Sequence, residues 1–284
     1  MNWAKILLEM ADKDLEAAKC LYDKELYPQS IFYLQQSVEK ATKSFGLVIG
    51  IVDENELMNN IGHNPLKIHK RLIYIHTKSL EKINEGIEKA PKFKEFPLIK
   101  TTNLNKTSQE TNESLNFFDD LVREKNVSSH SKEEIGGWIK ELNKLKAEVE
   151  ELNGDLTTRS ISNEEFNRVK QSILKLFDAL YEYNPQKIEK MRKELDNAIT
   201  IDLVEEMIRV ILSLKDAAYV LLSLLYLSII TRPHAIRTRY PVGDFNPLKI
   251  YNRDLPLIQS FTELNEIMKS TLFKMGNFFE VIER

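Results

Sequence analysis

Arginine, histidine and tyrosine gather in one short stretch of the sequence, RPHAIRTRY, at positions 232–240. Its candidate ligand-binding side chains are Arg232, His234, Arg237, Arg239 and Tyr240. A guanidinium group binds phosphate through two parallel hydrogen bonds, and a histidine or tyrosine ring can stack on a nucleobase. The stretch therefore predicts a basic pocket for a nucleotide or an RNA phosphate.

Two arginines of this stretch, Arg237 and Arg239, are separated by a single residue. Pro241 biases the residue before it towards an extended backbone. We therefore expect an extended segment in which both guanidinium groups point the same way and form a phosphate clamp. No Asp or Glu occurs between Asp216 and Asp244, so no carboxylate close in the sequence neutralises them.

Two early polar residues could join such a pocket or serve only the fold. Lys40 lies beside Glu39 in QQSVEK, and His63 lies in IGHNP. The functional interpretation adds Lys40 and His63 to the phosphate site. In the structural alternative, Glu39 or Asp14 pairs with an arginine of the late stretch, QQSVEK forms an interhelical hydrogen-bond network, and His63 pins the next helix.

The composition limits the remaining chemistry. The chain has 284 residues, a formal net charge of -3 and a pI near 6.1, so a polyanion site must be a local patch. Its one cysteine, Cys20, excludes an intramolecular disulfide and a cysteine-based zinc site, which favours a reducing, cytoplasmic location. No P-loop, Rossmann glycine pattern or H-E-x-x-H is present, so we predict no cofactor and no metal.

The hydrophobic segments indicate neither a signal peptide nor a membrane span. The start, MNWAKILLEMADKD, has acidic residues in its first turns and no small-residue cleavage site. The most apolar run, 217–230, is shorter than the roughly 20 residues that cross a bilayer. We therefore expect it to be a buried central helix and expect no membrane partner.

Apolar residues recur at helical spacing along most of the chain, and no segment of consequence has the alternation of a strand. The predicted class is all-α. The predicted helices cover about 2–24, 27–48, 65–89, 184–198, 202–230 and 254–282, with an additional pair in the middle of the chain.

That middle pair carries two heptad stripes. The first consists of Trp138, Leu142, Leu145, Val149 and Leu152, and the second of Phe166, Val169, Ile173, Leu176 and Leu180. Because the stripes match, we predict an antiparallel helical hairpin over 132–183. Ser162 and Glu165 suit a capping box at the start of its second helix, and Gly154 suits the end of its first.

The two ends of the chain resemble the two halves of a HEPN domain. IGHNPLKI resembles the family's histidine-containing entry to its third helix, and His234 followed by TRYP resembles its late histidine and Arg-Tyr-Pro sequence. The resemblance covers about 1–85 and 205–284, which divides the chain into a first part at 1–90, a helical insertion at 91–200 and a second part at 201–284. The residues that match in the first helix pair are Ala11, Asp14, Leu15, Ala17, Ala18, Leu21, Tyr27, Gln35, Gln36, Glu39, Lys40 and Lys43.

The resemblance implies an up-and-down helical bundle, homodimers, nucleotidyltransferase partners, and in many members RNA binding or cleavage. Ribonuclease members use an Arg-x4-6-His motif, in which arginine stabilises phosphate charge and histidine transfers a proton. Arg123 with His130 satisfies this spacing, and so does Arg71 with His76. The first pair is the better catalytic candidate, because Arg71 and His76 lie in mid-helix on different faces.

Three functional hypotheses follow. The first is a dimeric protein that binds a nucleotide or RNA phosphate in a regulatory, toxin–antitoxin or antiviral setting. The second is a metal-independent endoribonuclease that uses an Arg-His pair. The third is a structural or scaffolding protein that acts through the 132–183 hairpin.

Overall fold

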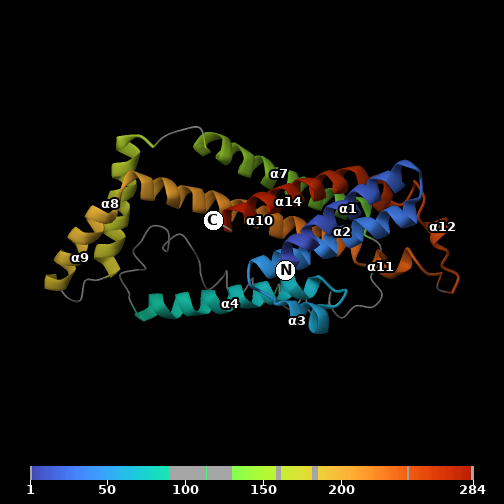
Figure 1. Cartoon of the computed structure of the whole chain (residues 1–284), viewed down its shortest axis with the longest axis horizontal. Coiled ribbons are helices and arrows are strands. Elements are labelled where there is room, and N and C mark those ends of the chain that lie inside the picture. Colours follow the sequence, from blue (N-terminus) through green and yellow to red (C-terminus); the bar gives the residue numbers. More distant parts are fainter. Residues whose placement is uncertain are drawn as a thin grey trace. The chain divides into compact units, whose positions relative to one another are not determined.

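Every regular element in the described part of the computed structural model is a helix (Figure 1). The structure describes residues 2–89, 113, 130–157, 161–180, 185–241 and 243–282, and no strand occurs within them, which confirms the all-α class. The longer helices are α1 (Trp3–Asp23), α2 (Tyr27–Val48), α4 (Leu66–Lys89), α7 (Lys132–Thr157), α8 (Asn163–Leu180), α9 (Pro185–Ala198), α10 (Ile201–Thr231) and α14 (Phe261–Ile282). The short ones are α3 (Glu54–Glu56), the π-helix η1 (Leu57–Ile61), α11 (His234–Arg237), α12 (Pro247–Ile250) and α13 (Pro256–Gln259).

Local sequence signals set the limits of the first two helices. The Asn2 side chain accepts a hydrogen bond from the Lys5 amide at 3.3 Å and caps α1. Glu25 has a φ of 60°, the left-handed conformation that turns the chain after α1. Pro28 lies in the first turn of α2, where its missing N–H leaves no helical hydrogen bond unmade.

A regular seam of small residues joins α1 to α2. Three buried serines of α2 donate to carbonyl oxygens of three buried alanines of α1, at a spacing of seven residues in both helices. The contacts are Ser30 to Ala18 at 2.8 Å, Ser37 to Ala11 at 2.7 Å and Ser44 to Ala4 at 2.6 Å. This register runs the helices antiparallel, and the small side chains let them approach closely.

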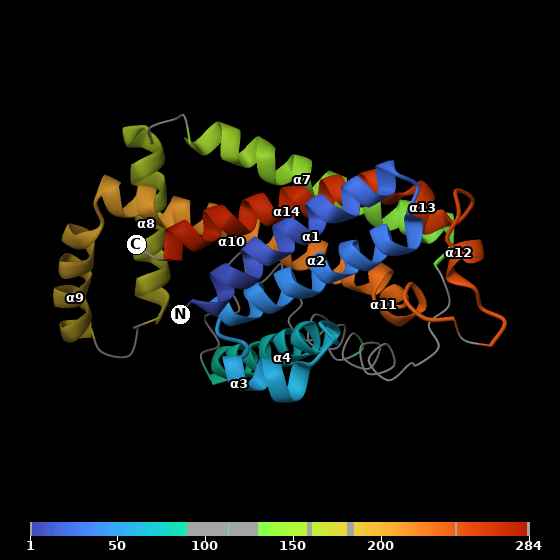
Figure 2. The same ribbon diagram turned by 45° about the vertical axis from the view of Figure 1, so that its right-hand side comes forward.

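Helix α14 completes this bundle beside α1 and α2 (Figures 1 and 2). The ring of Tyr22 stacks on Phe261 with centroids 4.2 Å apart, and its hydroxyl donates to the Ile258 carbonyl at 3.3 Å. Lys274 of α14 pairs with Asp216 of α10 at 2.6 Å. Early and late segments of the chain therefore share one core.

The two predicted heptad stripes pack into different hydrophobic clusters. On α7, Ile139 and Leu142 belong to the core of the α1–α2–α14 bundle, and Trp138 packs against it. On α8, Phe166 and Ile173 pack in a cluster with residues of α9 and α10. Both helices exist as predicted, and these described members of the two stripes pack with different partners. The antiparallel hairpin over 132–183 stays a prediction.

The predicted helix ends are partly correct. Ser162 and Glu165 form the predicted capping box, in which the Glu165 amide donates to the Ser162 hydroxyl at 3.2 Å. Helix α7 continues through Gly154 to Thr157, so this glycine does not end it. Thr200 caps α10, because its hydroxyl accepts a hydrogen bond from the Leu203 amide at 3.2 Å.

Helix α10, at Ile201–Thr231, is longer than the apolar run 217–230 within it. Over the described residues it is the one helix that could cross a membrane by length and composition, and 33% of its most apolar window is buried. A core helix of a soluble protein passes the same test, so this is weak evidence for a span. The predicted absence of a membrane partner stays a prediction.

The chain divides into two compact units. The first consists of Met1–Ile73, Leu115–Val149 and Lys215–Arg284, and the second of Tyr74–Ser114 and Glu150–Leu214. These limits lie inside α4, α7 and α10, whereas the sequence predicts domain limits near 90 and 200. The first unit contains the bundle and the late basic stretch.

Candidate functional site

Glu39 is the centre of a polar network on α2. Its side chain is only 5% exposed and receives hydrogen bonds from Lys43 at 2.7 Å and Gln35 at 3.1 Å. His63 Nδ1 lies 3.1 Å from the same carboxylate. Burial raises the pKa of Glu39, but the hydrogen bonds from Lys43, Gln35 and His63 outweigh it and lower the pKa below its ordinary value.

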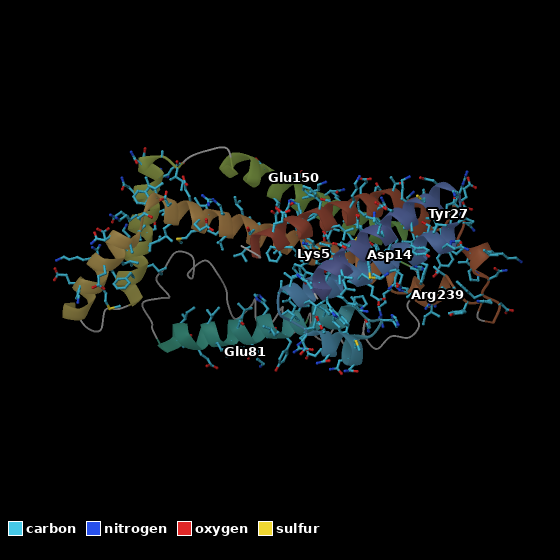
Figure 3. The ribbon with its side chains drawn as sticks, in the orientation of Figure 1. Lys5, Asp14, Tyr27, Glu81, Glu150 and Arg239 are labelled. Atoms are coloured by element: carbon cyan, nitrogen blue, oxygen red, sulfur yellow. The ribbon has the colours of Figure 1, made fainter. Side chains whose placement is uncertain are left out.

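Lys40 forms an ion pair with Asp14 of α1, which is labelled in Figure 3. Both early carboxylates are thus engaged by groups of the first third of the chain, namely Lys40, Lys43 and His63. The alternative in which Glu39 or Asp14 pairs with an arginine of the late stretch is not observed among the described residues. The network does join α1, α2 and the segment before α4, as the structural interpretation of Lys40 and His63 expects.

The basic stretch folds as a helical turn, which corrects the predicted extended segment. Thr238 donates its amide to the His234 carbonyl at 3.1 Å, and Arg239 donates to Ile236 at 3.0 Å. Pro233, with a φ of -55°, precedes α11 and suits its start. The extended bias that Pro241 exerts acts on Tyr240 alone, so it does not straighten the residues before it.

Within this turn Arg239 is held between two aromatic rings. Its guanidinium carbon lies 5.1 Å from the ring centroid of Phe32 on α2 and 5.3 Å from that of Tyr240. Its Nε donates to the Ala235 carbonyl at 3.0 Å. Arg239 and Tyr240 are both exposed, and no carboxylate of the described residues pairs with Arg239.

Arg237 points to a different aromatic side chain. Its guanidinium carbon lies 5.8 Å from the ring of Phe245, and no carboxylate in the described ranges forms an ion pair with it. Arg237 and Arg239 lie over different rings, so each guanidinium has its own aromatic support. Their convergence on one phosphate stays a prediction. Arg232 is half-buried and continues the last turn of α10, with its amide 3.0 Å from the Ser228 carbonyl.

His234 is buried rather than open to a ligand. Its Nδ1 lies 2.7 Å from the hydroxyl of Tyr251, and the two rings meet edge to face. Burial, with smaller contributions from the charges of Arg237 and His130, lowers the pKa of His234 to about 3. At neutral pH this residue is therefore uncharged and positions α11 against Tyr251, and it cannot offer a positive charge to phosphate.

His130 is the described member of the better catalytic pair, since Arg123 lies outside the described residues. The His130 ring is half-buried, meets Trp138 edge to face at 4.8 Å, and has Nε2 3.4 Å from the Ile229 carbonyl. Trp138 in turn stacks on Tyr226 at 5.9 Å. Ile229 lies in the last turn of α10, so His130 lies near the start of the basic stretch that follows this helix.

The other predicted pair has no such surroundings. Arg71 forms an ion pair with Glu56 at 2.5 Å, and His76 is exposed further along α4. His63, which the sequence places in the phosphate site, has a side chain 91% exposed beside Glu39. Among the described residues, no group of His, Cys, Asp or Glu has the arrangement of a metal site.

Sequence reasoning missed the aromatic residues that support the arginines. Phe32, Phe245 and Tyr251 come from α2 and from the segment after α11, and none belongs to a recognisable motif. The only sequence signal was the density of aromatic residues on both sides of RPHAIRTRY. Their pairing with arginine depends on the packing of α11 and α12 on α2.

The fold and this surface together define an all-α bundle protein whose late basic turn lies against the second helix. Residues 4–96 match the family model of the HEPN domain. That segment is therefore similar to the HEPN domain, in agreement with the resemblance of the first helix pair. The match does not include the late segment, so the family resemblance of 205–284 stays a prediction.

One similar protein comes from Methanocaldococcus jannaschii and is named as a putative toxin. It is 34% identical over 64 residues, which are 22% of this chain and 42% of the relative. The match thus spans less than half of that protein. No solved structure matches the chain.

Proposed function

We propose that this chain is a toxin-class HEPN protein that binds an RNA or nucleotide phosphate at the arginine–aromatic surface. We define this surface as Arg237, Arg239, Phe32, Tyr240 and Phe245. The observation that carries the proposal is the guanidinium of Arg239, exposed and held between Phe32 and Tyr240 without a carboxylate partner in the described ranges.

The chemistry of this surface favours a phosphate ligand. Stacking fixes the plane of the guanidinium but leaves its terminal N–H donors directed away from the rings. With Nε bonded to Ala235, the terminal nitrogens are the groups able to donate to a phosphate oxygen. The lysines of α2 are poorer candidates, because Lys40 and Lys43 already pair with Asp14 and Glu39.

The aromatic component favours a nucleic acid over inorganic phosphate. Tyr240 is 56% exposed, so a face or edge of its ring is accessible to a base. Unpaired bases stack on such rings in single-stranded RNA, where stacking contributes about 1–3 kcal/mol per base. We therefore expect single-stranded RNA to bind better than duplex RNA of the same length.

The biological setting is proposed from the comparisons. The HEPN match and the name of the M. jannaschii relative support a toxin–antitoxin context. In that context the partner is an antitoxin, and the family resemblance suggests a nucleotidyltransferase for this role. Co-expression of the neighbouring genes, followed by purification of a complex, tests the partner.

The binding proposal is tested with fluorescence anisotropy on labelled single-stranded RNA. Arg239→Gln should weaken binding by about 10-fold or more, which is the cost of about 1.5–3 kcal/mol for a lost charged hydrogen bond. The slope of log K against log salt should also fall by about 0.7 for each lost phosphate contact. Arg168→Gln, at an exposed arginine of α8, is the charge-matched control and should change binding less than about twofold.

Unchanged RNA binding in a folded Arg239→Gln protein would exclude the surface. Equal losses in the Arg239 and Arg168 variants would indicate non-specific charge attraction instead. The melting temperature should stay constant in both variants, because neither arginine is buried.

The second candidate function is a metal-independent endoribonuclease that uses His130 with Arg123. The observation in its favour is that the His130 ring packs against Trp138 and lies 3.4 Å from the carbonyl of Ile229, in the last turn of α10 before the basic stretch. A histidine there could transfer the proton of a 2′-hydroxyl or of the leaving group. RNA cleavage in EDTA that is lost in His130→Ala but kept in His76→Ala would support it, and absence of cleavage in the parent would exclude it.

A further inference from the structure

The first half of α10 exposes a stripe of large apolar side chains. Their exposed fractions are 42% for Leu203, 41% for Met207, 51% for Val210, 51% for Ile211 and 62% for Leu214. A contiguous apolar surface of this kind usually marks a contact with another molecule. We call these five residues the outer stripe.

The outer stripe is separate from the face that α10 uses for its own core. Val204, 1% exposed, and Ile208 pack in the hydrophobic cluster of the second unit, and Leu212 is 8% exposed. This part of α10 is thus apolar on two sides, only one of which is covered. A helix with apolar residues on both sides is typical of a buried helix rather than of a surface helix.

The spacing within the outer stripe suits an antiparallel copy of itself. Leu203, Met207, Val210 and Leu214 follow steps of four, three and four, the spacing of a coiled-coil seam. In an antiparallel pair of identical helices, Leu203 would face Leu214 of the second copy and Met207 would face Val210. The same four residues on each copy then form a two-fold, self-complementary contact.

The charges beside the stripe favour the antiparallel direction. Arg209 forms ion pairs with Glu205 and Glu206 of its own helix, at 3.7 and 2.7 Å, and Asp202 and Lys215 lie just before and just after the stripe. In the antiparallel register Asp202 of one copy faces Lys215 of the other, whereas parallel pairing places each residue beside its like. The helix dipoles also oppose each other favourably in this direction.

We propose that residues 203–214 of α10 form a homodimer interface through antiparallel contact with the same residues of a second copy. This inference does not rest on the RNA-binding proposal. The competing occupant is a lipid bilayer, since α10 has the length and composition of a span. The charged residues between 202 and 209, which border the stripe, make burial in hydrocarbon costly and favour the protein partner.

The interface is tested by sedimentation velocity of the full chain from about 1 to about 100 µM, the range in which mass action separates weak from stable dimers. The parent should dimerise within this range, and Met207→Glu/Val210→Glu should weaken the dimer by about 10-fold or more, because carboxylates would be buried without partners. Ile83→Glu is the matched control, since Ile83 on α4 is 52% exposed and lies outside the stripe. It should leave the dimer unchanged.

The direction of pairing is tested by cysteine cross-linking. In a Cys20→Ser background, which removes the chain's one native cysteine, Leu203→Cys and Leu214→Cys proteins are oxidised separately and as a mixture. The antiparallel interface predicts disulfide-linked dimers mainly in the mixture. Cross-linking of Leu203→Cys with itself in preference to Leu214→Cys would overturn the antiparallel arrangement.

Three results would overturn the interface itself. One is a parent that stays monomeric at every concentration. Another is a dimer that survives Met207→Glu/Val210→Glu, which would place the contact elsewhere. The third is a monomer that floats with vesicles of phosphatidylcholine and phosphatidylglycerol and loses this association in the double variant, which would assign the stripe to a bilayer.

Discussion

Two buried histidines should make the first unit sensitive to mild acid. His69 on α4 is 2% exposed and His234 is 5% exposed, and burial lowers the pKa of each to about 3. Neither nitrogen of His69 has a hydrogen-bond partner in the described residues. Both imidazoles are therefore neutral in the folded protein over the whole range in which an unfolded histidine gains a proton.

The direction and size of the effect follow from linkage. The unfolded pKa is 6.5, so below pH 6.5 the unfolded chain binds protons that the folded chain excludes until about pH 3. Stability contributed by the neutral state is present above pH 6.5 and is lost as the pH falls. Between pH 7 and pH 5 each histidine should cost about 2 kcal/mol and the pair about 4 kcal/mol, a large part of the roughly 5–15 kcal/mol typical of a domain.

Urea unfolding followed by tryptophan fluorescence measures this loss, because both tryptophans, Trp3 and Trp138, lie in the first unit. His69→Leu should reduce the difference in unfolding free energy between pH 7 and pH 5 by about half. His76→Leu, an exposed histidine of the same helix, should leave it unchanged. The pH window lies above the ordinary carboxylate range, so Glu39, whose pKa is lowered, does not contribute.

The reasoning fails if the parent loses less than about 1 kcal/mol between these pH values. It also fails if His69→Leu keeps the full pH dependence, because His69 would then not be held neutral in the folded state.

Two further predictions concern the packing of α2. Ser37→Ala should lower the unfolding free energy by about 1 kcal/mol, measured by urea denaturation, because it removes the hydrogen bond to Ala11 in the middle of the seam. Gly46→Ala should destabilise the protein in a thermal melt, because the new Cβ would lie 3.0 Å from a methyl carbon of Ile68, whereas Gly276→Ala, which meets nothing within 4 Å, should stabilise α14 by up to about 1 kcal/mol.

The sequence predicts helices well because their signals are local. Periodic apolar residues locate α1, α2, α4, α9 and α10 to within a few residues, and the Ser162 capping box is where its sequence suggests. Packing partners are less predictable. Heptad spacing shows that a helix has an apolar face, but it does not show which surface covers that face. The faces of α7 and α8 illustrate this, since their similar stripes enter different clusters.

The candidate site was predictable in residue types but not in geometry. The arginines of RPHAIRTRY include the exposed Arg239, but the same pattern gave no sign that His234 would be buried against Tyr251. The extended backbone expected from Pro241 was wrong because a proline restricts only the residue before it. The supporting ring of Phe32 is about 200 positions away, and only the tertiary fold brings it to Arg239.

Helix α2 contributes to both the seam with α1 and the arginine–aromatic surface, but through different faces. The proposed site can therefore be tested without disturbing the fold. Ser30, Ser37 and Ser44 recur every seven residues and face α1, where they hold the bundle together. Phe32 follows Ser30 by two residues, and at about 100° per residue its side chain projects from the opposite side of the helix. Because the seam and the arginine–aromatic surface use opposite faces of one helix, replacing Arg239 leaves every hydrogen bond of the seam in place. A loss of RNA binding in that variant can then be assigned to the surface itself and not to unfolding of the bundle.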